Sequence, residues 1–179
     1  MSRFQHNRIK PAQVVILGFL IQILVGACLL TLPVSTQSGE GASFLDALFT
    51  ATSATCVTGL VMYDTFTQWS AFGQVVILSM IELGGLGFMT WADVRTHGFH
   101  IRAYRLQSKI ILIMTAVLII VPTLIFYATE FGQNHDTMYL FPAMFQAVTT
   151  RTAGFNSVDL MTLSESNRAI LILLMLVGG

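Results

Sequence analysis

Two short segments rich in threonine, each closed by a glycine, are the residues of this sequence whose types and spacing suggest chemistry. The first is Thr55-Cys56-Val57-Thr58-Gly59, and the second is Arg151-Thr152-Ala153-Gly154. Glycine has no Cβ and tolerates the unusual backbone angles that turn successive carbonyl groups toward one axis. Rings of backbone carbonyls can replace the hydration shell of a cation. The pattern therefore predicts cation binding by main-chain oxygen atoms rather than covalent catalysis.

Both segments lie at matching places in a sequence that repeats itself after about 95 residues. Residues 47–59 coincide with residues 143–154 when a gap of one residue is allowed, and residues 75–85 coincide with residues 169–179. Each unit contains a hydrophobic span, a short amphipathic piece that ends in the Thr/Gly segment, and a second hydrophobic span. This order of elements is typical of an ion pore.

Long stretches with few charges predict helices that cross a membrane. Apolar residues make up 54% of the chain and charged residues 10%, whereas soluble domains contain about 25% charged residues. Residues 14–32, 74–92 and 110–129 are each long enough for a span, which takes about 20 residues. A fourth span begins at Ala169, and the residues after it reach only about 16 Å as a helix. We therefore expect this last span to be incomplete, as in a fragment or a truncated product.

The expected fold class is an all-α integral membrane protein with potassium-channel-like units. It consists of two parallel span–pore helix–span repeats, the second of them incomplete. Residues 1–92 form the first repeat, residues 93–109 form a basic cytoplasmic connector, and residues 110–179 form the second repeat.

Two short helices are expected directly before the Thr/Gly segments, at about residues 43–53 and 137–149. Ser43 can cap the first of them, with Asp46 three residues later. A helix of this length extends about 16 Å, half of a bilayer, so we expect both helices to be re-entrant.

The distribution of charge predicts the orientation in the membrane. Seven of the nine basic residues precede the first span or lie between the second and third spans. Because positive loops face the cytoplasm, the N-terminus and the loop at residues 91–109 are expected there. Acidic residues dominate the loops on the outer side. They either raise the local cation concentration at an entrance or simply form a solvated surface.

Two charged residues lie where charge is costly. Glu82 is the one carboxylate inside a span. Either it has a functional role, or its carboxyl contacts a neighbouring helix or is protonated, which is the simpler explanation. Arg151 belongs to the second Thr/Gly segment. We expect its side chain to point away from the ions and to brace the segment by pairing with an acid such as Asp159 or Asp64.

Other motifs favour ordinary explanations. His97 and His100 lie in a basic loop and are expected to be solvated rather than to bind a metal. The Gly84-Gly85-Leu86-Gly87 run favours close helix packing. Cys28 and Cys56 fall in a span and a loop, which is no disulfide framework.

The two segments and their flanks, Thr55-Cys56-Val57-Thr58-Gly59-Leu60 and Thr149-Thr150-Arg151-Thr152-Ala153-Gly154-Phe155-Asn156, resemble filter segments of the Trk/Ktr/HKT potassium uptake family. Members of this family carry four span–pore–span repeats in one chain, and each repeat supplies one filter strand with a key glycine. The resemblance implies that backbone carbonyls of the filter bind K⁺. The residues it assigns to this site are Thr55, Cys56, Val57, Thr58, Gly59, Arg151, Thr152, Ala153 and Gly154.

The resemblance also implies a function, which is K⁺ transport across the cell membrane by a pore subunit that is not an enzyme. It implies no cofactor: K⁺ is the transported ion, with Na⁺ as an alternative. The expected partners are membrane lipid, a second copy of the chain in a homodimer, and a cytosolic ring of nucleotide-binding regulatory subunits, but not nucleic acid.

The two units look like the first and third repeats of the family. The alternative function is therefore a non-conducting, truncated remnant that inserts in the membrane without transport. A membrane-embedded enzyme has little support, because the sequence offers no nucleophile–base pair.

Overall fold

The computed structural model describes residues 11–87, 90, 93, 104–131, 140–151, 153–158 and 163–178, and all regular elements in that part of the chain are helical. The main helices are α1 (Pro11–Leu30), α2 (Phe44–Cys56), α4 (Ala71–Gly85), α6 (Leu106–Phe126), α7 (Leu140–Thr149) and α8 (Glu165–Gly178). Shorter elements are the 3-10 helix η1 (Pro33–Ser35), helix α3 (Thr65–Gln68) and the π-helical turn η3 (Tyr127–Phe131).

Helices α1 and α6 are long and apolar enough to cross a membrane, by length and composition. They contain the apolar stretches Gln13–Leu30 and Leu106–Thr129, in each of which only 17% of the best window is buried. A helix that is hydrophobic on all sides but exposed is suited to lipid, whereas the core helix of a soluble protein is covered. The two spans expected at residues 14–32 and 110–129 are therefore confirmed as long helices.

Helix α2 begins as its sequence predicts. Ser43 has extended backbone angles, and its hydroxyl accepts a hydrogen bond from the amide of Asp46 at 3.2 Å. This bond satisfies one of the amides that the first turn of a helix leaves unpaired. The helix continues to Cys56, three residues beyond the expected end near Ser53, so it includes part of the first Thr/Gly segment.

Helix α4 is shorter than predicted. Within the span expected at residues 74–92, α4 ends at Gly85, in the glycine run, and the described residues Gly87 and Thr90 are again helical. Gly87 has a φ of +72°, a left-handed conformation that interrupts a right-handed helix. The glycines at this point thus terminate the helix as well as allowing close packing.

The second unit shows the same order of elements, which is a long helix, a short helix and a further helix. Helix α7 ends at Thr149, as predicted, while its expected start near Thr137 lies outside the described residues. Helix α8 begins at Glu165, four residues before the predicted start at Ala169. Phe126, Ala143 and Leu171 pack together, so α6, α7 and α8 share a small core.

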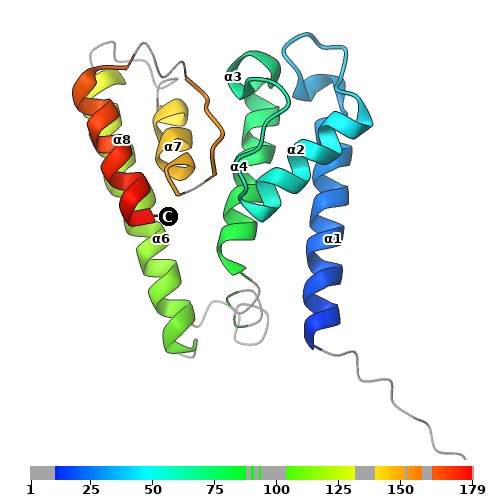
Figure 1. Ribbon diagram of the computed structural model, residues 1–179, viewed down its shortest axis with the longest axis horizontal. Helices are drawn as coiled ribbons and strands as arrows, with labels where there is room; N and C mark the ends of the chain where they lie inside the picture. Colours follow the sequence, from blue (N-terminus) through cyan, green and yellow to red (C-terminus); the bar gives the residue numbers. More distant parts are fainter. Residues whose placement is uncertain are drawn as a thin grey trace, which may run out of the picture.

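A larger core connects the two units (Figure 1). Ala27 from α1, Ala51 from α2 and Ile77 from α4 pack in one cluster with Phe145 from α7 and with Phe155, which follows the second Thr/Gly segment. Figure 1 shows α4 and α7 in the middle of the molecule, with α1 on one side and α6 and α8 on the other. This arrangement brings the C-terminal ends of α2 and α7 toward the same region.

Candidate ion-binding site

The first loop, residues 55–59, begins at the end of α2, where the backbone reverses sharply. The amide of Val57 donates to the carbonyl of Ala54 at 3.2 Å, and the amide of Thr58 donates to the carbonyl of Ser53 at 3.0 Å. These two bonds form the Schellman arrangement that closes a helix and pairs its last carbonyl groups. It requires a left-handed residue, and Val57 takes that place with φ 53° and ψ 41°.

A β-branched residue in this conformation is strained, because its Cβ approaches the following carbonyl group. The packing around the loop must therefore hold Val57 in place. One contribution is a hydrogen bond of 3.0 Å between the hydroxyls of Ser53 and Thr58. Gly59 follows with a φ of +74°, so the backbone is left-handed a second time within three residues.

The second loop, residues 151–154, follows the end of α7 and is closed differently. The amide of Ala153 donates to the carbonyl of Thr149 at 3.1 Å, and the amide of Arg151 donates to the carbonyl of Val148 at 3.1 Å. The hydroxyl of Thr149 donates to the carbonyl of Phe155, which fixes the chain on the far side of the loop. Gly154 has a φ of +70°, close to the value of Gly59.

The two loops meet at their glycines. A Cβ built on Gly154 would lie 2.5 Å from the Cα of Gly59 and 3.0 Å from the Gly59 carbonyl oxygen. A Cβ built on Gly59 would lie 3.0 Å from the Cα of Gly154 and 3.1 Å from the Ala153 carbonyl oxygen. Main-chain oxygens of Gly59 and Ala153 therefore lie at the meeting point, where neither glycine has room for a side chain.

Arg151 has a partner that the sequence did not predict. Its Nη1 lies 3.1 Å from Oε1 and 3.2 Å from Oε2 of Glu82, and its Nη2 donates to the hydroxyl of Thr115 at 3.1 Å. The prediction of Asp64 was wrong, because Asp64 caps α3 by accepting from the amide of Thr67 at 3.1 Å. Asp159 lies outside the described residues.

The same contact places Glu82 against the second loop. Its carboxyl makes a helix-to-loop contact through an ion pair with Arg151, with side-chain exposures of 20% and 17%. The expected contact with a neighbouring helix is thus a contact with a loop of the other unit, and the functional role given as the alternative stays a prediction. The pair could not be predicted from the sequence, because 69 positions separate the two residues.

The predicted site residues differ in accessibility. Thr55 and Ala153 are buried, Val57, Gly59 and Arg151 are half-buried, and Cys56, Thr58 and Gly154 are exposed. Thr152 lies outside the described residues, as do His97 and His100. Among the residues that the structure describes, no group of three or more histidine, cysteine or carboxylate side chains could hold a metal ion.

Three buried oxygen atoms near the ends of α2 and α7 have no hydrogen-bond partner in the described part of the chain. They are Oγ1 of Thr55, Oε1 of Gln146 and Oγ of Ser157. Buried polar atoms usually have a partner, from the protein or from ordered water, so these atoms suit a water molecule or another donor. Gln146 and Ser157 were missed in the sequence, although the duplication aligns Gln146 with Thr50 of α2.

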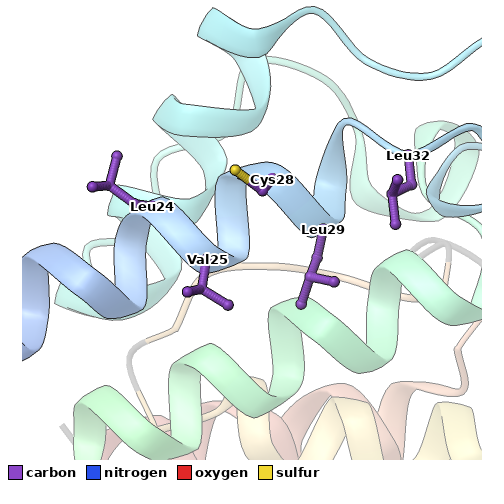
Figure 2. Close-up of a pocket in the computed structure, with 5 residues that line it drawn as sticks. All are labelled: Leu24, Val25, Cys28, Leu29 and Leu32. Atoms are coloured by element: carbon purple, nitrogen blue, oxygen red, sulfur yellow. The ribbon is translucent and has the colours of Figure 1, made fainter.

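An apolar groove lies away from the loops, on α1 (Figure 2). It is lined by Leu24, Val25, Cys28, Leu29 and Leu32. These side chains offer hydrocarbon and a single free thiol, which suits contact with acyl chains rather than binding of an ion.

Comparison with known proteins gives the second loop a family context. Residues 97–179, which include the second loop, match the family model described as TrkH, cation transport protein. Potassium/sodium uptake protein NtpJ of Enterococcus hirae is 52% identical over 89 residues, which cover 50% of this chain and 20% of that protein. Ktr system potassium uptake protein B of Bacillus subtilis is 55% identical over 85 residues, covering 48% of this chain and 19% of that protein.

The corresponding protein B of Vibrio alginolyticus is 43% identical over 90 residues, covering 50% of this chain and 19% of that protein. The matched stretch thus spans about a fifth of each of these relatives, whose names describe transporters rather than enzymes. The helical architecture, the exposed apolar helices and these matches agree. Over about half of its length, the chain is similar to cation transport proteins of the Trk/Ktr family.

Proposed function

We propose that this chain is part of a pore subunit for potassium uptake in the cell membrane. K⁺ loses its hydration water and binds main-chain oxygens of residues 55–59 and 151–154. The observation that carries this proposal is the meeting of two left-handed glycines, Gly59 and Gly154, at the ends of two short helices. The relatives' names, which mention potassium and in one case sodium, support the choice of ion.

The short helices add an electrostatic contribution. The C-terminal end of a helix carries a partial negative charge, about half an elementary charge, which falls off within the last turn. Helix α2 ends at Cys56, inside the first loop, and α7 ends at Thr149, just before the second loop. Both ends therefore favour a cation at the loops, and Na⁺ is the second ion that this field would accept.

The domain organisation proposed is two parallel repeats, residues 1–92 and 110–179, joined by a cytoplasmic connector at residues 93–109. The repeated order of long helix, short helix and further helix supports it. A ring of carbonyls around one ion needs four strands, and the two loops supply two. We propose that a second copy of the chain supplies the others, in a lipid-embedded dimer regulated by cytosolic nucleotide-binding subunits, with the N-terminus cytoplasmic.

The test is Rb⁺ uptake by cells that lack their own potassium uptake systems. The parent chain is compared with Gly59→Ser and Gly154→Ser, each of which places a side chain where the loops meet. We expect uptake by the parent, and a loss of on the order of tenfold or more in both variants, because small displacements in a pre-organised site have large effects.

Two other glycines provide matched controls. Gly39 has a φ of +73°, and Gly18 lies in α1; no atom of the described residues comes within 4 Å of a Cβ built on either of them. Gly39→Ser tests backbone strain alone, and Gly18→Ser tests the substitution alone; both should retain uptake. A parent chain that inserts in the membrane but takes up no Rb⁺ would contradict the proposal and favour the non-conducting alternative.

A further inference from the structure

A single turn of helix α4 contacts both loops. Gly84 of α4 packs against the end of α2 so closely that a Cβ there would overlap the carbonyl oxygen of Thr55. Two residues earlier, Glu82 forms the ion pair with Arg151 of the second loop. The loops themselves meet at Gly59 and Gly154. Each loop is thus fixed once to α4 and once to the other loop.

The contact of the second loop is made by charge rather than by backbone packing. Two short distances join Nη1 of Arg151 to the carboxyl oxygens of Glu82, and Nη2 reaches the hydroxyl of Thr115 on α6. The planar guanidinium therefore bridges α4 and α6, and its donors are fixed relative to one another. A bridge to two helices constrains both the position and the orientation of the loop.

The surroundings make this bridge hard to open. Both side chains are more than three-quarters covered, and the core to which α4 belongs is largely apolar. Removing one partner would take away the counter-charge that this ion pair supplies, at a much greater cost than on a solvated surface. Screening by salt also has little effect on a pair that water scarcely reaches.

The ion pair lies two residues from the contact between the loops. Arg151 is separated from Ala153 by one residue, and the carbonyl oxygen of Ala153 lies beside Gly59. Movement of Arg151 would therefore move an oxygen atom of the candidate site. We propose that Arg151 is a positioning residue: its ion pair with Glu82 sets the spacing of the two loops and, through that spacing, the choice between K⁺ and Na⁺. The effect on ion choice rests on the proposed function.

The first test detects movement of the second loop and does not require transport. Ala153 is fully buried, so Ala153→Cys in a Cys28→Ala/Cys56→Ala background should react slowly with a water-soluble maleimide. Adding Glu82→Gln or Arg151→Gln should raise the labelling rate on the order of tenfold by releasing the loop. The charge swap, Glu82→Arg with Arg151→Glu, should restore protection.

Ala47 is the matched control, because it is fully buried in α2 and distant in sequence from the pair. Labelling of Ala47→Cys should stay unchanged in the same variants. The proposal is overturned if Ala153→Cys labelling does not respond, if both cysteines respond together as in general loosening, or if the swap restores nothing.

The second test measures the ratio of Na⁺ to Rb⁺ uptake in cells. Either single neutral variant should raise this ratio on the order of tenfold, and the swap should return it toward the parent value. An unchanged ratio with lower total uptake would show a purely structural role. A parent chain without uptake would overturn the proposed function and the effect on ion choice, while the labelling rates would still decide whether the pair positions the loop.

Discussion

The two loops occupy equivalent places in their units, yet they are attached to the rest of the molecule by different forces. The first loop rests on α4 through backbone packing at Gly84, and its own closing contacts are local, as in the Ser53–Thr58 pair. The second loop rests on the same turn of α4 through the charge of Arg151. Close packing tolerates no added atom, whereas an ion pair tolerates movement but not the loss of a partner. Substitutions at the two attachments should therefore destabilise the protein by different mechanisms, overpacking at the first and loss of a partner at the second.

The largest effect is expected at the attachment of the first loop. Gly84→Ala adds a methyl group that would overlap the Thr55 carbonyl oxygen, so α4 and α2 must separate. We expect the free energy of unfolding to fall by about 3 kcal/mol, at the upper end for overpacking. Thermal unfolding of the protein in detergent micelles measures this change.

Gly85→Ala is the matched control, because among the described residues its Cβ would have one neighbour within 4 Å, Nη2 of Arg151 at 4.0 Å. This variant should be neutral or gain up to about 1 kcal/mol from the higher helix propensity of alanine. Equal destabilisation by both variants would mean that the close approach of α4 to α2 does not anchor the first loop.

A smaller effect is expected at the attachment of the second loop. Thr115→Val removes the hydroxyl that accepts from Nη2 of Arg151, while keeping the shape of the side chain. Loss of a bond to a charged group in a largely covered site should cost about 2 kcal/mol. Thermal unfolding in micelles is again the measurement.

Thr123→Val on the same helix tests whether this cost comes from Arg151. The hydroxyl of Thr123 donates to the carbonyl of Ile119 at 2.6 Å, within α6, and its burial matches that of Thr115. Such a bond within a helix contributes little to its stability, so Thr123→Val should be nearly neutral. Similar losses in the two variants would remove the special role assigned to Thr115.

The smallest effect is expected within the first loop itself. Ser53→Ala removes one hydroxyl of the pair with Thr58, but the exposed Thr58 hydroxyl can turn to water. We expect a loss of about 0.5 kcal/mol. Ser79→Ala in α4, whose hydroxyl donates to the carbonyl of Val75 at 2.8 Å, is the control. If Ser53→Ala lost much more stability than Thr115→Val, the comparison would be reversed, because local bonds would then hold the first loop more firmly than α4 does.

Local features of the fold could be predicted because they depend on residues near one another in the chain. Ser43 with Asp46 predicted the start of α2, and the charge-free stretches predicted α1 and α6. The sequence predicted that each Thr/Gly segment lies at the end of a short helix, and the structure has left-handed backbone in these segments, at Gly59 and Gly154. The end of α4 was missed because an apolar stretch continues past the glycines that stop the helix.

The sequence by itself determined the two long apolar helices, the start of α2 and the places of the two glycine loops, since hydrogen bonds and hydrophobic periodicity act over a few residues. Only the tertiary structure decided that Gly59 meets Gly154, that Gly84 contacts Thr55, and that Arg151 pairs with Glu82 rather than with Asp64. These contacts join residues far apart in the chain, and several acids were available to one arginine. Packing of α4 between the two loops selects the partner, because it places one carboxylate within reach and leaves the alternative capping α3.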